Sequence, residues 1–431
     1  MTEVITLGIG GAGVSVCHNL WDYYIQERDN NQEYEKYNQA VNFHEDSAGS
    51  YVPRGLFIDT DPTGTDLVQE SAIQHWFNDD HYSTGSDGTG TNYGEGRYTS
   101  GREQIPEIQD KLRKQAESCD SSPIIFIIGS TSGGTGSGLS DLICEDLYSE
   151  FNIIKYNIYH PPTSLSIPNE CFNTMYSTRF CQEYARFSVN VDNDQCVDIL
   201  NRLGISDPTY DDINSLLSSN ISMITCINFL TPSFAPWEVI PKVPNQFPTL
   251  NEITEDLFRC SNSLITTSQQ EDQIIAANIS KKVDLTDSLL WRCSPGRPHQ
   301  LALVSSSIGS IEHSQKSDLN TFCDFTNTAM EVNKTELGEG CTRFSDKVTD
   351  TLYNMKRSAC MLLNSGKTAE VLERVATAFD KLCRPRAYFH TYLGLGFGEG
   401  EFTENREFFA CMLQDYFELS AKYQPPEFIE E

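Results

Sequence analysis

Several features that would place the chain in a membrane, secreted or metal-binding class are missing from its 431 residues. No stretch reaches the roughly 18 consecutive apolar residues of a membrane-spanning helix. The start, MTEVITLGIGGAG, has no basic region ahead of an apolar core, so we expect no secretory signal peptide. The 14 cysteines form no C-x-x-C pair, which argues against metal clusters and predicts reduced, mostly buried thiols in the cytoplasm.

Positive charge is also scarce. Lys and Arg number 31 against 61 Asp and Glu, which gives a net charge of −30. A chain this acidic has no general attraction for nucleic acid or an anionic membrane, so we expect neither as a partner. The acidity serves either solubility or the docking of basic proteins. Apolar residues (39%) and aromatics (11%) suffice for folded cores, and the length suggests about two to three domains.

Strand and helix signals alternate over the first 160 residues. Strands are expected at 4–7, 56–58, 124–128 and 153–159, and helical patterns follow the first and third of them. This alternation predicts an α/β fold with a Rossmann-like parallel sheet covered by helices on both faces. Because ligands of open α/β sheets bind at the carboxyl ends of strands, the Gly-rich and acidic segments that follow these strands are the expected site.

The rest of the chain is less regular. Residues 78–101 are rich in Gly, Ser, Thr and Asp and are expected to be a loop, and Pro106 is expected to open a helix that ends near Glu117. A strand is expected at 301–304. Two amphipathic helices, 366–383 and 404–423, are predicted near the C-terminus.

The first glycine loop fits the G-x-G-x-x-G pattern of dinucleotide-binding folds at Gly8, Gly10 and Gly13. In that class an acidic residue follows about 20 positions later, at the end of the second strand. Here the region around Glu33 is polar loop, and the second strand ends only at Asp59. An NAD-dependent oxidoreductase is therefore an alternative that rests on this loop alone.

A second glycine loop, GSTSGGTGSG at 129–138, lies between a predicted buried strand and a predicted helix. Its glycines allow backbone N–H groups to approach phosphate oxygens, and the helix N-terminus favours an anion. Thr135 and Ser137 add hydroxyl donors. The loop lacks the Lys of a Walker A motif, which excludes a P-loop NTPase. The alternative is a glycine turn that only packs.

The segment GGTGSG at 133–138 matches the phosphate-binding signature of the tubulin superfamily, and the chain resembles a divergent tubulin over nearly its whole length. NYGEGRYT at 92–99 and PTYDDIN at 208–214 resemble further tubulin segments. Three segments look more like α-tubulin than β-tubulin: AGV at 12–14, CMLLN at 360–364 and GEFTENRE at 400–407.

The resemblance implies a tubulin-like architecture with three parts. These are a GTP-binding domain at 1–192, a core helix with an intermediate α/β (activation) domain at 193–365, and a C-terminal helical hairpin at 366–431. It also implies two cofactors, GTP and Mg²⁺.

The resemblance further implies roles for individual residues. Those assigned to the phosphates come from the two glycine loops: Gly10, Gly11, Ala12, Ser130, Gly133, Gly134, Thr135 and Gly136. Asn193 and Asn214 match the two asparagines that read the guanine edge, for which an amide offers both a donor and an acceptor. Tyr210 matches the aromatic residue that stacks on the base. Asp61 would lie near the Mg²⁺, directly or through water.

The chain also departs from the family. α-Tubulins usually carry Gln where this chain has Gly11. In tubulins, the next subunit activates GTP hydrolysis with a loop of the pattern Gly-x-x-Asn-x-Asp followed by a catalytic Glu. Here the corresponding stretch, TPSFAPWEVIP at 231–241, lacks the Gly, Asn and Asp. Glu238 is the only acid between Thr231 and Leu250, and is either the catalytic residue or a solvated loop residue.

Two functions from different classes follow. The first is a structural GTP-binding cytoskeletal subunit of microtubules or a specialised filament, which pairs with a β-type tubulin or itself and has a weakened ability to activate hydrolysis. The alternative is a non-polymerising tubulin relative that acts as a nucleotide-dependent capping or regulatory factor. Motors or microtubule-associated proteins are the basic partners that the acidic surface would suit.

Overall fold

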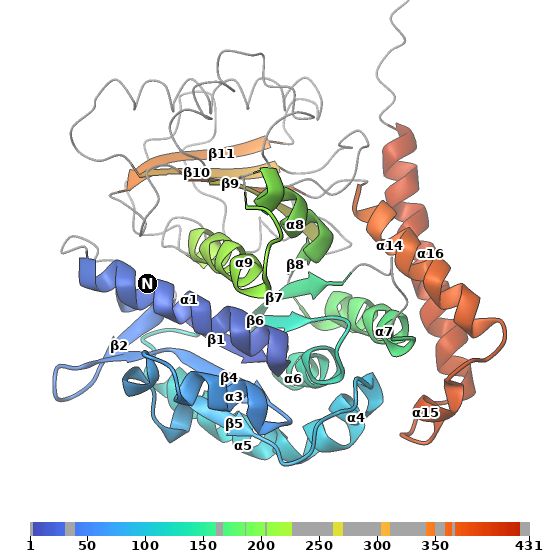
Figure 1. Cartoon of the computed structure of the whole chain (residues 1–431), viewed down its shortest axis with the longest axis horizontal. Helices are drawn as coiled ribbons and strands as arrows, with labels where there is room; N and C mark the ends of the chain where they lie inside the picture. The colour runs from blue at the N-terminus through green and yellow to red at the C-terminus, as the bar shows by residue number, and fades with distance from the viewer. Residues whose placement is uncertain are drawn as a thin grey trace, which may run out of the picture.

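The computed structural model describes residues 3–30, 39–160, 167–185, 187–202, 205–225 and 367–422, and four strands between 262 and 363. Its centre is a sheet in which six neighbouring strands run parallel in the order β5-β4-β1-β6-β7-β8 (Figure 1). Their bounds are β1 (Val4–Ile9), β4 (Gly55–Asp59), β5 (Tyr82–Thr84), β6 (Ile124–Ser130), β7 (Asn152–Tyr159) and β8 (Phe187–Asp192). The predicted Rossmann-like parallel sheet is confirmed.

Four later strands continue the same sheet beyond β8. They are β9 (Asn262–Gln269), β10 (Leu303–Ser310), β11 (Thr342–Thr349) and β12 (Ser358–Leu363). β9 pairs parallel with β8, whereas β12 is inserted antiparallel between β9 and β10, and β11 forms the edge. The strand predicted at 301–304 corresponds to β10, which begins at Leu303.

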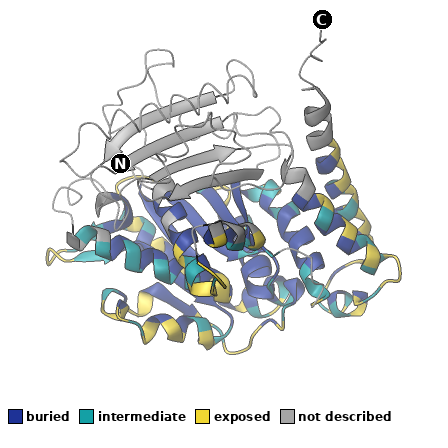
Figure 2. Cartoon of the chain, turned by 45° about the horizontal axis from the view of Figure 1, so that its top comes forward, coloured by how far each residue is buried: buried dark blue, intermediate teal, exposed yellow. Residues whose placement is uncertain are grey.

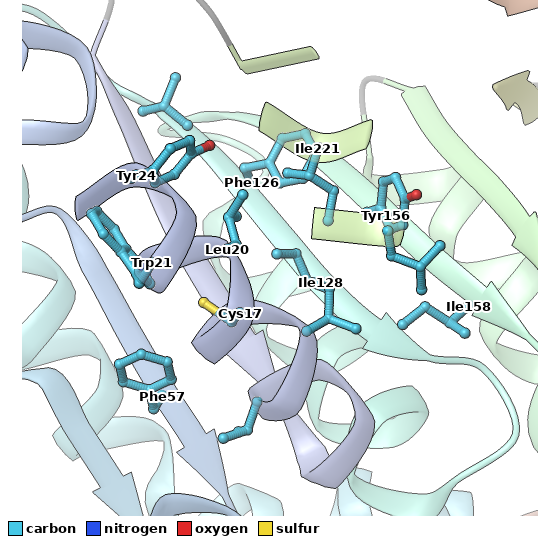
Figure 3. Packing of buried hydrophobic residues seen from close by; sticks show 14 of the residues in the cluster. Cys17, Leu20, Trp21, Tyr24, Phe57, Phe126, Ile128, Tyr156, Ile158 and Ile221 are labelled. Atoms are coloured by element: carbon cyan, nitrogen blue, oxygen red, sulfur yellow. The ribbon is translucent and has the colours of Figure 1, made fainter. Parts of the chain in front are cut away.

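One face of the sheet is covered by α1 and α9. The helices around this face are α1 (Gly10–Asn30), α2 (Gln39–Asn42), α3 (Pro62–Gln69), α8 (Asn193–Arg202) and α9 (Tyr210–Thr225). Leu20 and Tyr24 of α1 belong to a single buried cluster with Phe126 and Ile128 of β6 and Ile221 of α9 (Figure 3). This cluster fixes α1, and therefore the glycine loop at its start, against the central strand.

The opposite face is covered by α5 (Ser100–Glu117) and α6 (Ser140–Leu147). Ile125 and Ile127 of β6 pack there with Ile108 of α5 and Ile143 of α6. Successive side chains of a strand point to opposite faces, so a strand between two helical layers needs apolar residues at every position. This explains the unbroken run Ile124–Ile128.

The C-terminal helices pack mainly on α7 (Figures 1 and 2), and α14 also touches the sheet, where Val371 packs with Tyr159 of β7. The elements are α7 (Asn169–Tyr184), α14 (Lys367–Cys383), α15 (Phe389–Leu393) and α16 (Glu399–Lys422). Phe172 of α7 and Phe379 of α14 lie in a cluster with Phe402 and Met412 of α16. Both predicted C-terminal helices are confirmed, although α16 begins five residues earlier than expected.

Two local predictions were wrong. Residues 78–101 contain β5, the short helix η3 (Asp79–His81) and α4 (Tyr93–Tyr98). α4 forms because Asn92 caps it, since its side chain accepts a hydrogen bond from the amide of Gly94 at 2.8 Å. α5 begins at Ser100, so Pro106 lies inside this helix instead of opening it. The fixed φ of proline is compatible with a helix, and the helix tolerates the loss of one backbone hydrogen bond.

The cysteines of the described residues are all free thiols. Most are buried, as expected: Cys17, Cys144, Cys171, Cys181 and Cys196. Within the same residues, no helix combines the length and apolar character needed to cross a bilayer.

Candidate functional site

The order of the parallel strands creates a switch point between β1 and β6. From β1 the chain builds outward to β4 and β5, then returns to the other side of β1 and continues through β6, β7 and β8. Ligands of open α/β sheets bind at such a point, outside the carboxyl ends of the strands. Ile9 at the end of β1 is level with Gly129 of β6, so the two glycine loops begin side by side.

The first loop is a direct junction between β1 and α1, which begins at Gly10. Gly10 has φ +72°, and a Cβ built on it would lie 2.8 Å from the amide nitrogen of Gly136 in the second loop. Only glycine permits both this conformation and this approach. Gly11 and Ala12 are exposed. Because the first amides of a helix have no intrahelical acceptor, the N-terminus of α1 offers donors to an anion.

The second loop leads from β6 into the π-helical turn η4 (Thr135–Leu139) and α6. A Cβ on Gly136 would lie 2.8 Å from the carbonyl oxygen of Ser130, and one on Gly134 would lie 2.7 Å from the amide nitrogen of Asn92. These glycines are required by the packing of backbone on backbone. π-Turns inside helices are rare and occur frequently at functional sites.

Two other glycines of the loops border open space. Nothing lies within 4 Å of a Cβ built on Gly133, and the nearest atom to one on Gly11 is a carboxylate oxygen of Asp59 at 4.0 Å. Close packing within the protein does not require glycine at either position. Room for a ligand is the other reason for a residue without a side chain there. At these two positions an anion has room to approach the glycine loops.

Three threonine hydroxyls join the second loop to its neighbours. The Oγ1 atom of Thr135 lies 2.6 Å from that of Thr60, which follows β4, and 3.2 Å from that of Thr89. All three residues are buried. The chain of hydroxyls fixes the rotamer of Thr135, the residue that the sequence assigned to the phosphates.

Two aspartates lie at the carboxyl end of β4: Asp59 is its last residue, and Asp61 comes two positions later. Asp59 is only 6% exposed, and burial raises the pKa of its carboxyl to about 6. Asp61 is half-buried and caps α3, where its carboxylate accepts a hydrogen bond from the amide of Thr63 at 2.7 Å. Hydrogen bonds from Thr63 hold the pKa of Asp61 below its usual range, so this side chain stays ionised.

The residues assigned to the base begin the two helices after β8. Asn193 is the first residue of α8, and its Oδ1 atom is buried without a hydrogen-bond partner among the described residues. Tyr210 begins α9 and is 70% exposed, and the half-buried Asn214 lies one turn later on the same side of this helix. A buried, unpaired amide oxygen is costly unless a ligand donor satisfies it.

These features fit a nucleoside phosphate with Mg²⁺. The two helix N-termini and the open glycines suit phosphate oxygens, and the orphaned oxygen of Asn193 suits a base N–H. Mg²⁺ is typically held by one or two carboxylates together with phosphates and water, which the ionised Asp61 allows. Within the described residues, no group of three or more His, Cys, Asp and Glu could hold a metal by itself.

The structure brings the predicted phosphate residues together at one edge of the sheet, with Asp61 on the adjacent strand end. Thr60, Thr89 and the buried Asp59 were not among the residues predicted from the sequence. Asp59 and Thr60 stand directly before the predicted Asp61 in the segment DTDP, and this position could have pointed to them. Nothing in the segment 78–101 singled out Thr89. Glu238 and the rest of 231–241 lie outside the described residues.

The fold and the site together define a nucleotide-binding α/β domain that uses two glycine loops and no P-loop lysine. Comparison with known proteins agrees, since residues 3–201 match the Tubulin/FtsZ family, GTPase domain. The chain is 26% identical to the Tubulin alpha-3 chain of Saccharomyces cerevisiae, over 99% of this chain and 100% of the relative. It is 28% identical to the Tubulin alpha-6 chain of Naegleria pringsheimi, over 98% and 96%, respectively.

Together these matches support a divergent, α-like protein of the tubulin superfamily. The similarity is not confined to the nucleotide domain, because it also covers 98% of this chain against the Tubulin alpha-2 chain of Caenorhabditis elegans. GTPase domains of this family bind GTP with Mg²⁺, so the chain is a tubulin-type GTP-binding subunit.

Proposed function

We propose that this chain is an α-type cytoskeletal subunit in the cytoplasm that binds GTP and joins a microtubule or a specialised filament. The observation that carries the proposal is the pair of glycine loops at the switch point of the sheet, in a chain that aligns with α-tubulins almost from end to end. By this similarity, the partner is a β-type tubulin or a second copy of the chain. Motors or microtubule-associated proteins would bind the acidic surface.

The proposed nucleotide contacts are divided among three regions. Backbone amides at Gly10, Gly11 and Ala12 would bind the phosphates together with the second loop, which contributes Ser130, Gly133, Gly134, Thr135 and Gly136. Asn193 and Asn214 would read the guanine edge, and the exposed ring of Tyr210 would stack on the base. Asp61 would hold Mg²⁺ against the phosphates.

The proposed domains are the nucleotide domain at 1–192, the core helix and intermediate domain at 193–365 and the C-terminal helices at 366–431. The boundaries fall at element ends, since β8 ends at Asp192 and α14 begins at Lys367. α9 is the proposed core helix. Its Ser218 donates a hydrogen bond to the carbonyl oxygen of Val16 on α1, 3.0 Å away, which ties the core helix to the helix of the first glycine loop.

We also propose that this subunit activates GTP hydrolysis on a longitudinal neighbour only weakly. The motivation lies in the sequence, because 231–241 lacks the Gly, Asn and Asp of the activating loop and retains one acid, Glu238. Activation needs a group that orients and polarises the attacking water. Phosphate release during assembly with a β-type tubulin tests this proposal. We expect phosphate to be released slowly, and at the same rate in the wild type and in Glu238→Ala. Phosphate release at the rate of ordinary assembly-coupled GTP hydrolysis that is lost in Glu238→Ala would contradict the proposal.

The second function, a non-polymerising capping or regulatory factor, is favoured by the same altered segment. Co-sedimentation separates the two. A filament subunit is expected to pellet along the whole polymer in proportion to polymer mass. A capping factor would pellet in proportion to the number of filament ends, and shearing the filaments would increase the amount bound.

A further inference from the structure

Asn173, on α7, lies at the centre of a hydrogen-bond cluster that the nucleotide contacts above do not use. The residue is fully buried, at 0% exposure. Its Nδ2 atom donates to the carbonyl oxygens of Thr91 (2.9 Å) and Ser132 (2.7 Å). Its Oδ1 atom accepts from the amide of Tyr93 (3.0 Å) and the hydroxyl of Tyr392 (2.8 Å). Both donors and both acceptor positions of the amide are therefore used.

One of the segments held by Asn173 is the second glycine loop. Ser132 lies in that loop, and its hydroxyl is 2.9 Å from the hydroxyl of Ser130, a proposed phosphate contact. The hydrogen bond from Asn173 to the carbonyl of Ser132 joins this stretch of the loop to α7.

The other segment is the neighbouring loop at 89–92, which is strained. Thr91 has φ +58°, in the left-handed region that β-branched residues rarely adopt. Asn173 bonds the carbonyl of Thr91 and the amide of Tyr93, on either side of Asn92. The Asn92 backbone packs against Gly134 and Thr89 contacts Thr135, so the strained loop and the second glycine loop are in contact at two places.

The cluster also reaches the C-terminal helices. Tyr392 belongs to α15, and the neighbouring Thr391 accepts a hydrogen bond at its carbonyl oxygen from Nδ2 of Asn92, 3.0 Å away. α15 is therefore attached once to Asn92, 299 positions away in the chain, and once to Asn173, 219 positions away. Packing alone does not need these bonds, since the ring of Tyr392 is already enclosed by Phe172, Tyr176 and Phe397.

We propose that Asn173 is a positioning residue of the nucleotide site, which holds the segments 89–92 and 130–135 in the conformation that receives the phosphates. Through Tyr392, it also makes α15 a support of that conformation. The proposal rests on the GTP site described above. It predicts that changes at α7 and α15, outside the set of nucleotide contacts, weaken the binding of phosphates without affecting the binding of the base.

The test compares variants of the full-length chain after nucleotide removal, with GTP and guanosine as the two probes. Asn173→Ala removes all four hydrogen bonds, and we expect its Kd for GTP to rise about tenfold or more. Tyr392→Phe removes one of these four bonds, together with the 3.3 Å contact of the same hydroxyl with the carbonyl oxygen of Asn169, and we expect a rise of about threefold. The Kd for guanosine should stay within about twofold in both variants, since neither residue supports the base side.

The chain offers a matched control in Tyr176→Phe. Tyr176 lies in the same aromatic cluster, with its ring 6.1 Å from that of Tyr392, but its buried hydroxyl has no hydrogen-bond partner among the described residues. Loss of the Tyr176 hydroxyl should therefore leave the Kd for GTP unchanged. If Asn173→Ala fails to fold, the Kd values for GTP of Tyr392→Phe and Tyr176→Phe are compared instead, and the proposal predicts a rise only in Tyr392→Phe.

Equal GTP affinity in wild type and Tyr392→Phe would overturn the supporting role of α15. An equal loss of GTP and guanosine binding would show general destabilisation, and would overturn the positioning role of Asn173. If the wild-type chain itself fails to bind GTP, the nucleotide site fails and this proposal fails with it. The two failures can be told apart, because in the second case the wild-type chain binds GTP and only the variants depart from the prediction.

Discussion

At the scale of single residues, the glycines of the two loops fall into two groups that the motif alone does not distinguish. Gly10, Gly134 and Gly136 are surrounded by backbone at distances that exclude a Cβ. Gly11 and Gly133 have free space around them. The first group forms the loops, and the second leaves room for the phosphates that the loops are proposed to bind.

This difference predicts opposite results for two alanine substitutions. Gly136→Ala would place a Cβ 2.8 Å from a carbonyl oxygen, and overpacking of this kind costs roughly 1–3 kcal/mol, so the melting temperature should fall. Gly133→Ala meets no atom within 4 Å, so it should melt like wild type but bind GTP more weakly. Thermal melts and GTP titrations of both variants measure this. The opposite pattern would mean that the open space is not the phosphate site.

The hydroxyl bonds of Thr135 give a second residue-scale prediction. Thr60→Val keeps the shape of the side chain but removes its 2.6 Å contact with Thr135. We expect GTP affinity to fall by about three- to tenfold, which corresponds to one buried hydrogen bond. Thr178→Val is a suitable control, because Thr178 makes a similar buried bond to Tyr159 at 2.8 Å. Equal effects of the two substitutions would argue against a special role for Thr60.

His81 predicts a dependence of stability on pH. Its ring is buried, its Nε2 atom donates to the carbonyl oxygen of Pro53 at 3.1 Å, and burial lowers its pKa. The unfolded chain therefore binds the proton more readily, so stability is present above about pH 6.5 and is lost as the pH falls below that value. The drop in melting temperature between about pH 7.5 and 5.5 should be smaller in His81→Gln. His75→Gln, at an exposed position, should behave like wild type.

At the scale of elements, a buried ion pair joins β7 to α6 and α7. Lys155 of β7 contacts Asp141 of α6, both at 0% exposure, and also donates to the hydroxyl of Ser177 on α7 at 3.0 Å. Removing one partner of such a pair leaves an uncompensated buried charge.

Lys155→Met is therefore expected to destabilise the chain by about 3–5 kcal/mol, while the double variant with Asp141→Leu should recover most of the loss. Chemical denaturation measures both. The exposed pair of Arg113 and Glu117 provides the comparison, since Arg113→Ala should leave the denaturation midpoint close to that of the wild type. A double variant as unstable as Lys155→Met would contradict this account of the pair.

The elements differed in how far the sequence could predict them. β6 was predictable because a strand buried on both faces needs apolar residues throughout. α4 was missed because the Gly- and Thr-rich composition around it indicates loop, whereas the cap by Asn92 depends on a single side chain. The contacts of Thr60 and Thr89 with Thr135 could not be predicted, because they join residues 75 and 46 positions apart. No local pattern encodes such contacts.

At the scale of the whole molecule, one sheet continues from the nucleotide strands through β9 to β11. The C-terminal helices lie against α7 beside it (Figure 1). The second glycine loop is therefore connected to α15 through Asn173, which bonds both Ser132 and Tyr392.

The most direct test of the central claim is to identify the nucleotide that accompanies the native chain. The chain is purified in buffer with Mg²⁺, denatured in acid, and the released small molecules are separated and quantified against the protein. The site described here predicts GTP or GDP at close to one per chain, lowered in Gly133→Ala. Recovery of a nicotinamide dinucleotide, or of no guanine nucleotide from a folded chain, would contradict it.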